Sequence, residues 1–184
     1  FLREGADVNV RDSAGCAPLH EAARTGNVVR ARQLLEKRAD VNVRNKAGQT
    51  PVHLAAEHDH GTVAGLLLEH GANPNARDVR GLTPLHIQAA RGCVPIVRLL
   101  LNAGANPNLR DNTARTPFHT ACEHGQADII ELLLDKGADL YAQDKSSMTP
   151  LHLAADMGRG EVVKLLVSRG ADTEIRETTG KTPL

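Results

Sequence analysis

The sequence predicts an all-α solenoid, in which helix-turn-helix units stack in a row and are joined by short β-hairpin loops. The first observation is a motif of the form Thr-Pro-Leu-His that recurs every 33 residues; its copies begin at Ala17, Thr50, Thr83, Thr116, Thr149 and Thr182. The second observation is a motif of the form Gly-Ala-Asp with the same period; its copies begin at Gly5, Arg38, Gly71, Gly104, Gly137 and Gly170. A constant period without insertions indicates a stack of equivalent units, each of which contacts only its neighbours.

The last complete unit shows the motifs most clearly. Residues 149–154 read Thr-Pro-Leu-His-Leu-Ala, an apolar helical segment follows, and Gly170-Ala171-Asp172 ends the unit. This pattern resembles the ankyrin repeat, and the resemblance extends over the whole chain. It implies an ankyrin-repeat solenoid whose concave groove, formed by the hairpin tips and the exposed side of each first helix, binds another protein.

The spacing predicts a single ankyrin-repeat domain over residues 1–184. It divides into a partial repeat at 1–11, full repeats at 12–44, 45–77, 78–110, 111–143 and 144–176, and a partial repeat at 177–184. Neither end carries the polar capping repeat that a free-standing array needs. We therefore expect the chain to be a fragment of a longer array or of a larger protein.

Each unit predicts its elements in the same order. An Asp-x-x-Gly turn, such as Asp78 to Gly81, makes the hairpin, because Asp bonds nearby backbone N–H groups and Gly tolerates a positive φ. Thr83 and Pro84 then begin a short first helix, in which small alanines allow close packing. A Gly separates it from an apolar second helix, and a Gly such as Gly104 ends that helix in the left-handed conformation.

Several units depart from this pattern. Arg38 and Asp59 stand where other units have a left-handed Gly, and Ala114 and Ser147 replace the hairpin Gly. If Arg38 keeps the left-handed conformation, it should cost on the order of 1 kcal/mol in stability. Because Gly61 and Gly65 also fall in its second helix, the unit at 45–77 is the expected weak point of the array.

Composition excludes several classes of function. The 22 basic and 22 acidic residues give a formal net charge of zero, and the only aromatic residues are Phe1, Phe118 and Tyr141. Neither feature favours binding to nucleic acid, and no apolar run is long enough for insertion into a membrane. Three cysteines without a CxxC pair indicate a reducing compartment, the cytoplasm or the nucleus; they are Cys16, Cys93 and Cys122.

Histidines are the first candidates for chemistry. Five recur at the fourth position of the Thr-Pro-Leu-His motif: His20, His53, His86, His119 and His152. Packed helices lie about 8–10 Å apart, whereas zinc ligands lie about 2 Å from one ion, so we expect these histidines to be structural. A second group, His58, His60 and His70 with Asp59, meets no spacing rule for a metal site. We predict no metal and no cofactor.

No catalytic constellation appears in the sequence. It contains no Walker lysine loop, no H-E-x-x-H and no G-x-S-x-G motif, and the Gly158-Arg159-Gly160 segment is an interhelix turn. We therefore predict that the chain is not an enzyme.

An arginine also recurs at the end of most units. This arginine ladder consists of Arg11, Arg44, Arg77, Arg110 and Arg176, with Gln143 as the one interruption. Each member precedes the Asp, Asn or Glu that opens the next unit. Pairing with these acidic residues is the favoured interpretation, and a phosphate-binding stripe is the alternative.

The resemblance also indicates which positions face the groove. The candidate partner-binding residues are Arg24, Lys46, His58, Arg80, Leu82, Arg91, Arg115, His124, Lys145, Met148 and Met157. Among the groove positions six are basic and three are acidic, the latter being Glu57, Glu123 and Asp156. The expected partner is an acidic, partly apolar segment of another protein.

The expected function is that of a monomeric scaffold or adaptor that binds another protein. The alternative is that the array recruits substrates for a larger enzyme, such as a ubiquitin ligase subunit or a kinase. Leu34, Asp40, Val41 and Asn42 also resemble the pattern in which asparagine is hydroxylated in other ankyrin arrays, so Asn42 is a candidate for this modification.

Overall fold

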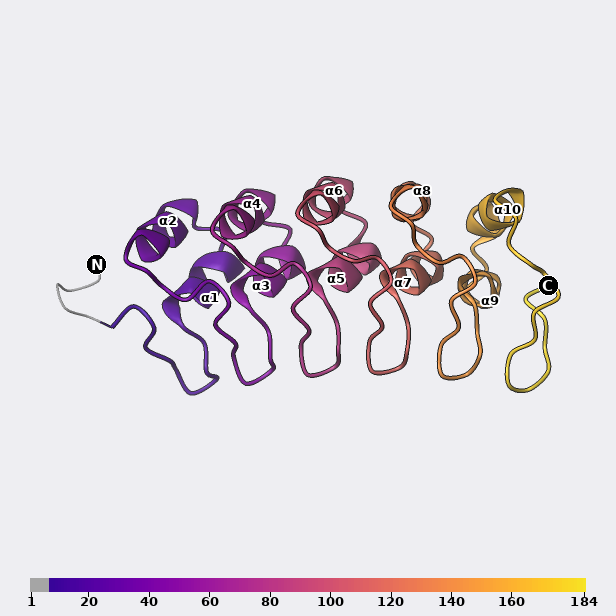
Figure 1. The fold of residues 1–184 in the computed structure, drawn as a ribbon, viewed down its shortest axis with the longest axis horizontal. Helices are drawn as coiled ribbons and strands as arrows, with labels where there is room; N and C mark the ends of the chain where they lie inside the picture. Colours follow the sequence, from indigo (N-terminus) through magenta and orange to yellow (C-terminus); the bar gives the residue numbers. More distant parts are fainter. Residues whose placement is uncertain (1–6) are drawn as a thin grey trace.

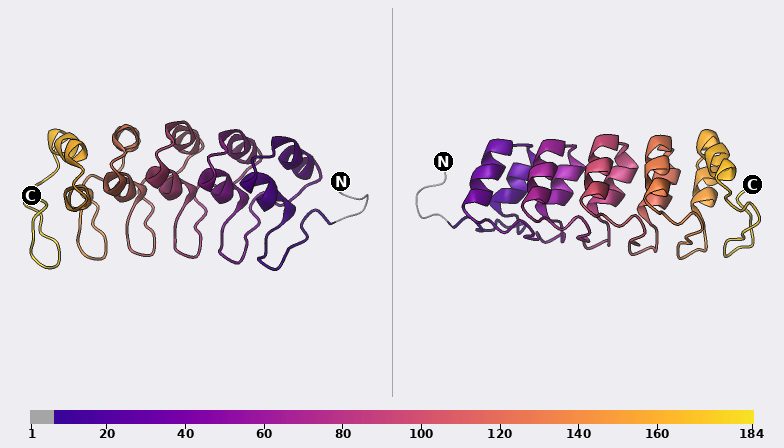
Figure 2. Two further views of the ribbon diagram at one scale, coloured as in Figure 1. Left: turned by 180° about the vertical axis from the view of Figure 1, so that it is seen from behind. Right: turned by 45° about the horizontal axis from the view of Figure 1, so that its top comes forward.

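The computed structural model describes residues 7–184, which form ten α-helices in five pairs (Figure 1). The pairs are α1 (Pro18–Arg24) and α2 (Val28–Glu36), α3 (Pro51–Glu57) and α4 (Gly61–Glu69), α5 (Pro84–Arg91) and α6 (Val94–Asn102), α7 (Pro117–His124) and α8 (Ala127–Asp135), and α9 (Pro150–Asp156) and α10 (Gly160–Ser168). The odd-numbered inner helices form one row and the even-numbered outer helices another (Figure 2). The predicted all-α solenoid is confirmed, and Gly5, which begins the first Gly-Ala-Asp copy, lies outside the described residues.

Each inner helix begins at the proline of its motif. In α5 the preceding Thr83 is extended, at φ −98°, and its backbone N–H donates to Nδ1 of His86 at 3.2 Å. The Thr83 Oγ1 atom lies 2.9 Å from the same nitrogen. This arrangement satisfies backbone groups that a helix start leaves without partners, and proline at the first turn costs no hydrogen bond.

The loops between the pairs are narrow turns that hang from the helices on one side (Figure 1). In the third unit the Asp78 N–H donates to the Leu82 carbonyl at 2.9 Å, and the Asp78 Oδ1 atom accepts from the N–H groups of Arg80 and Leu82, both at 2.8 Å. Residues 7–184 contain no β-strand, so the predicted β-hairpins are turns without a regular ladder. Their hydrogen bonds nevertheless hold the loops in one repeated shape.

Within residues 7–184, four residues other than glycine adopt the left-handed conformation, and each stands where other units have a glycine. Their φ angles are 61° for Arg38, 57° for Asp59, 66° for Ala114 and 60° for Ser147. Glycine occupies the equivalent position in the other units, for example Gly71 at φ 84°. The repeated backbone therefore overrides the preference of each side chain at these positions.

Replacing Arg38 with glycine is expected to stabilise the protein by up to about 1 kcal/mol, because glycine adopts a positive φ without steric cost. The Arg38 side chain is exposed, so little packing is lost. Equilibrium urea unfolding would measure the change. As a control, the neighbouring Lys37 has a right-handed φ of −84°, so Lys37→Gly should lower the midpoint. A midpoint for Arg38→Gly that is unchanged or lower would contradict the prediction.

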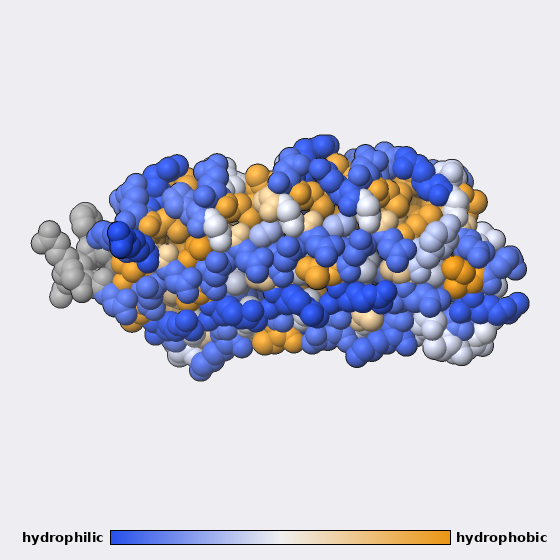
Figure 3. All heavy atoms as spheres, viewed as in Figure 1, coloured by the Kyte–Doolittle hydropathy of each residue, from blue (hydrophilic) through white to orange (hydrophobic). Residues whose placement is uncertain are grey.

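The core is a continuous strip between the two rows of helices. Phe118 is its largest fully buried side chain, and Leu19, Leu85 and Leu151 occupy the equivalent position in other units and are also buried. On the face shown in Figure 3, apolar residues reach the surface mainly over the helices, and the region below them is mainly hydrophilic. The strip links neighbouring units, so the stability of each unit depends on its neighbours.

Candidate functional site

The loop tips and the inner helices together border the candidate groove. Each tip donates one backbone hydrogen bond to the tip before it: Val79 N–H to the Ala47 carbonyl at 3.0 Å, Asn112 N–H to the Arg80 carbonyl at 2.9 Å, and Lys145 N–H to the Thr113 carbonyl at 3.0 Å. The tips are therefore held in a regular row. A preformed surface of this kind costs little conformational entropy when a partner binds.

A cleft of about 260 Å³ lies at the centre of this groove, lined by Glu57, Arg80, Leu82, His86, Ile87, Ala90, Arg91 and Thr120. It brings together three of the predicted binding residues, Arg80, Leu82 and Arg91. Sequence reasoning missed Ile87 and Thr120, which follow the histidine of their motifs directly. The sequence did indicate this position, because the residue after the motif histidine varies between units: Glu21, Leu54, Ile87, Thr120 and Leu153.

Most of the expected groove cations are already in ion pairs. Arg24 pairs with Glu21 at 2.7 Å and Arg91 with Asp59 at 2.5 Å. Both of these carboxylates were left out of the sequence count of groove charges. The expected positive excess is therefore largely cancelled at these two positions.

The other two arginines are also paired, but to different extents. Arg115 contacts Glu123 at 3.1 Å and Asp144 at 3.2 Å, and its side chain is only 29% exposed. Arg80 lies 3.3 Å from the buried carboxylate of Asp78, yet its own side chain is 67% exposed. Arg80 can therefore meet a partner, whereas Arg115 mainly connects neighbouring units.

The two predicted lysines differ from the arginines. Lys46 and Lys145 are exposed at the tips of the second and fifth units, and neither forms an ion pair with a residue in 7–184. Together with Arg80 they leave three accessible cations along the row of tips.

The predicted apolar contacts are spread along the groove. Leu82 lines the central cleft and is half-buried, and Met148 is half-buried in the fifth unit. Met157, at the end of α9, is 49% exposed. The structure thus places Leu82 beside Arg80 and Arg91 but does not bring either methionine into the same cleft.

The two predicted groove histidines are exposed. The ring of His58 stacks on that of His60, with centroids 6.2 Å apart. Nδ1 of His124 lies 2.9 Å from the Thr120 carbonyl, which can only accept, so this nitrogen donates. The His124 ring therefore folds back on its own helix.

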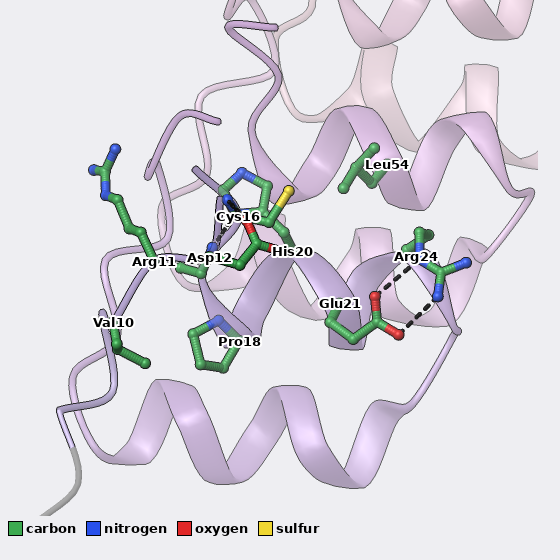
Figure 4. Close-up of a pocket in the computed structure, with 10 residues that line it drawn as sticks. Val10, Arg11, Asp12, Cys16, Pro18, His20, Glu21, Arg24 and Leu54 are labelled. Carbon is green, nitrogen blue, oxygen red and sulfur yellow. Dashed lines mark hydrogen bonds and ion pairs between the residues drawn. The ribbon is translucent and has the colours of Figure 1, made fainter. Parts of the chain in front are cut away.

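A second cavity, of about 540 Å³, lies near the N-terminal end of the described residues (Figure 4). Figure 4 shows the Glu21–Arg24 ion pair along one side, with Cys16 and His20 nearby and Leu54 from the next unit. The Nε2 atom of His20 already bonds to the Gln49 carbonyl at 3.0 Å, so it is not free to act on a ligand.

The five motif histidines link neighbouring units. Nδ1 of His119 accepts the Thr116 N–H at 3.2 Å, so the proton is on Nε2, which donates to the Met148 carbonyl at 3.2 Å. His20, His53, His86 and His152 make the equivalent bond to the residue 29 positions later. Burial lowers the pKa of His119 to about 4 and also lowers the pKa of His20, His53 and His86.

His60 and His70 do not form a metal site, because each is hydrogen-bonded to a main-chain carbonyl. Nε2 of His60 donates to the Arg24 carbonyl at 3.1 Å, and Nδ1 of His70 donates to the Leu66 carbonyl at 2.8 Å. Among residues 7–184, no three His, Cys, Asp or Glu side chains are arranged to hold a metal ion.

We predict that thermal unfolding of the protein is independent of metal ions, because the ring nitrogens of the motif histidines are used in hydrogen bonds between units. Melting curves recorded with and without a strong chelator should superimpose. A fall of several degrees in the presence of the chelator would contradict the structural role of these histidines.

The cysteines are unpaired in the structure. Cys16 and Cys93 are half-buried and Cys122 is fully buried, as expected for a residue in place of a packing alanine. Burial raises the pKa of the Cys122 thiol, which makes it unreactive.

Within residues 7–184 no member of the arginine ladder forms an ion pair with an acidic residue, so that interpretation was wrong. Arg44 donates from Nη2 to the Arg77 carbonyl at 2.7 Å, and Arg77 donates likewise to the Arg110 carbonyl at 2.8 Å. Arg11 and Arg110 make the same bond, to Arg44 and to Gln143. A main-chain carbonyl satisfies one donor but leaves the positive charge uncompensated.

Asn42 forms a clasp between two units. Its Nδ2 donates to the Gly71 carbonyl at 3.1 Å, and its Oδ1 accepts the Asn73 N–H at 2.8 Å. Asn75 and Asn108 form the same clasp one and two units later. An enzyme that modifies Asn42 must therefore first open these two hydrogen bonds.

Comparison with known families agrees with this architecture. A family model for ankyrin repeats in three copies matches residues 1–78 and 77–144, and a model for ankyrin repeats in many copies matches residues 133–184. No curated protein matches the sequence. None of the helices in residues 7–184 combines the length and apolarity needed to cross a membrane. Ankyrin repeats are generally non-catalytic modules that bind proteins, and this chain belongs to the ankyrin repeat family.

Proposed function

We propose that the chain is a protein–protein interaction scaffold that binds a partner across its concave groove. The observation that supports this proposal best is the central cleft, which the apolar side chains of Leu82 and Ile87 line together with Arg80 and Arg91. An apolar pocket with a polar rim is the usual form of a binding hot spot. Since the tips are already held in a row, the partner meets a rigid surface.

The proposed partner is an acidic, partly apolar segment of another protein. Successive tips are about one stacking distance apart, on the order of 10 Å, and an extended chain advances about 3.3 Å per residue. Carboxylates about three residues apart can therefore reach Lys46 and Arg80 on successive units, and a carboxylate about six residues further on can reach Lys145 two units later. An apolar residue between them would enter the cleft at Leu82.

The first test is affinity capture with matched variants. Leu82→Asp combined with Arg80→Glu places negative charge in the cleft and should abolish capture of the true partner. Arg98→Glu combined with Val29→Asp changes charge by the same amount on exposed outer-helix positions and should have no effect. A protein retained equally by all three forms is not a groove ligand, and if no protein is lost on the cleft variant the groove proposal fails.

Kinetic measurements then separate charge from apolar contact. Arg80→Glu with Lys46→Glu should slow association and flatten its salt dependence, because exposed charges mainly guide encounter. Met148→Ala with Met157→Ala should mainly speed dissociation. Arg115 is left unchanged, since replacing it would expose Glu123 and Asp144 to each other. Surface plasmon resonance at two salt concentrations would measure both effects.

We further propose that the protein acts as a monomer in the cytoplasm or nucleus. Support for the compartment comes from the three unpaired cysteines. Light scattering during gel filtration, without reductant and with it, would report the mass, and a dimer under reducing conditions would contradict the proposal.

Asn42 remains our proposed hydroxylation site. Peptide mapping by mass spectrometry of protein from cells that contain an asparagine hydroxylase should show an added oxygen on Asn42. Asn75 and Asn108 are internal controls, because they form the same clasp but follow Asn-Pro instead of Asp-Val. An unmodified Asn42 in such cells, or equal modification of all three, would contradict the role of the sequence pattern.

A further inference from the structure

The arginine ladder is a continuous row of positive charge outside the groove. Arg11, Arg44, Arg77 and Arg110 are all exposed, and each donates to the carbonyl group 33 residues later. The face in Figure 3 carries a hydrophilic band that follows the same long axis, between the helices and the loop tips. These bonds hold the guanidinium groups in place, so binding an anion costs little side-chain entropy.

The charges of this row are not neutralised within the described chain. None of the seven ion pairs in residues 7–184 includes a member of the ladder. The nearest turn carboxylates are already engaged, because Asp78 is buried against Arg80 and Asp111 accepts hydrogen bonds from Thr113 and Arg115. The ladder therefore differs from the groove, where carboxylates offset most arginines.

The middle of the ladder lies in a polar cleft without acidic residues. A cavity of about 530 Å³ is lined by Asn42, Arg44, Thr50, Asn73, Asn75, Ala76 and Arg77. It shares no residue with the central cleft of the groove. At the position of Asn73, other units carry Asp7, Asp40, Asp139 and Asp172, whereas the units of Arg77 and Arg110 carry Asn73 and Asn106. These two units of the ladder are thus free of a carboxylate at this position.

From these observations we infer that the arginine ladder is a second binding surface, which takes an acidic polypeptide segment in extended conformation. Units follow one another at a stacking distance of about 10 Å, so a carboxylate at every third residue meets successive arginines. Each guanidinium uses one or two N–H groups on main-chain carbonyls, as Arg77 does with Gly81 and Arg110, and keeps the others for a carboxylate.

Nucleic acid is the other polyanion that a row of arginines can bind, and the structure favours it less. Single strands bind where aromatic side chains stack on the bases. Within residues 7–184 the aromatic residues are Phe118, which is fully buried, and Tyr141, which lies beyond Arg110 near the interruption at Gln143. The ladder offers positive charges at a spacing that an extended polypeptide can match, but it offers no aromatic surface on which bases could stack.

The test uses a labelled peptide that repeats Glu-Ser-Gly four times, which is about 40 Å long when extended. Fluorescence anisotropy at low and at physiological salt would measure its binding to the whole chain. The peptide should bind, a peptide with Gln in place of Glu should not, and salt should weaken the complex.

Asn73→Asp combined with Asn106→Asp is the decisive variant. It adds carboxylates beside the arginines at positions where other units already carry Asp, so the fold should tolerate it. It should weaken peptide binding by about tenfold. Asn27→Asp with Asn102→Asp, which changes net charge equally at exposed positions elsewhere, should leave binding unchanged.

Three results would overturn the inference. The first is no binding of the acidic peptide at low salt. The second is an equal effect of the two Asn→Asp pairs, which would place the peptide elsewhere on the chain. The third is tighter binding of a labelled oligothymidine of similar length than of the peptide. None of these outcomes bears on the groove, whose partner is tested with separate variants.

Discussion

Acidification from pH 7 to about pH 4.5 is expected to destabilise the protein by several kcal/mol, through the buried histidines that join its units. For His119, whose pKa falls from 6.5 to about 4 in the fold, the full contribution is about 3 kcal/mol. His20, His53 and His86 contribute in the same direction, because burial lowers the pKa of each.

The geometry explains why these rings stay neutral. Nδ1 of His119 faces the Thr116 N–H and Nε2–H faces the Met148 carbonyl, so a second proton on Nδ1 would oppose a donor. Protonation would also place a charge in the core strip, where desolvation disfavours it. The charged ring therefore cannot keep both the helix start and the link to the next unit.

The sign of the pH dependence follows from the lowered pKa. Above the pKa of about 6.5 that histidine has in the unfolded chain, the ring is neutral in both states and its contribution to stability is fully present. Between that pKa and the lower pKa of the folded state, the unfolded chain binds more protons than the folded protein. Stability therefore falls as the pH falls through this range. Asp59, whose pKa is lowered by its hydrogen bonds with Arg91, adds a loss only below the usual range of a carboxyl group.

Urea unfolding at several pH values between 7 and 4.5 would measure the effect. His119→Gln removes one titrating group but keeps an amide that can accept and donate, so its stability should depend less steeply on pH than that of the wild type. His58→Gln, at an exposed position outside the core, is the matched control and should retain the wild-type slope. A midpoint that stays constant down to pH 4.5 would refute the role of the buried rings.

Much of the fold follows from the sequence because the period constrains every unit at once. The motif prolines begin the inner helices, and the left-handed φ of Arg38 and Ala114 could be predicted from the glycines that occupy their positions elsewhere. Local chemistry decides these features, and each is repeated several times in the chain. A wrong prediction for one unit would therefore have disagreed with the predictions for the equivalent positions of the other units.

The charge of the groove could not be predicted in the same way. Arg91 and its partner Asp59 are 32 residues apart, and Arg115 and Asp144 are 29 apart, so both pairs join neighbouring units. A count of groove positions includes one member of each pair and omits the other. The backbone carbonyls that receive the arginine ladder are equally invisible in a sequence, because every residue carries one.

Contacts between units also bear on the unit at 45–77, which the sequence predicts to be the weak point of the array. Beside Gly26, Gly92 and Gly125 the structure leaves no comfortable space for a Cβ, which would lie 2.6 Å from the His60 ring, 2.6 Å from Gln126 and 3.1 Å from Arg159 respectively. Each of these contacts comes from the residue 34 positions later. For Asp59 that residue is the short Cys93, which explains why a side chain fits there.

Asp59 also has partners that a glycine would lack. Its Oδ1 accepts from Nε of Arg91 at 2.9 Å and from Nε2 of Gln88 at 3.0 Å, and Gln88 is fully buried where other units have alanine. Nε2 of Gln88 also donates to the Ala56 carbonyl. This polar network joins the second and third units, and it offsets the conformational cost of a left-handed Asp59.

Asp59→Gly is therefore expected to destabilise the protein by about 1–2 kcal/mol, the opposite sign to Arg38→Gly. Relief of the left-handed conformation gains about 1 kcal/mol. Loss of a half-exposed ion pair costs up to about 1 kcal/mol, and a buried amide with a missing partner costs about 1–3 kcal/mol. Urea unfolding of Asp59→Gly, Gln88→Ala and the double variant would isolate the coupling. In the Gln88→Ala background, which restores the alanine of other units, the cost of Asp59→Gly should fall sharply. An Asp59→Gly protein that is more stable than the wild type would show that the network does not outweigh the strain.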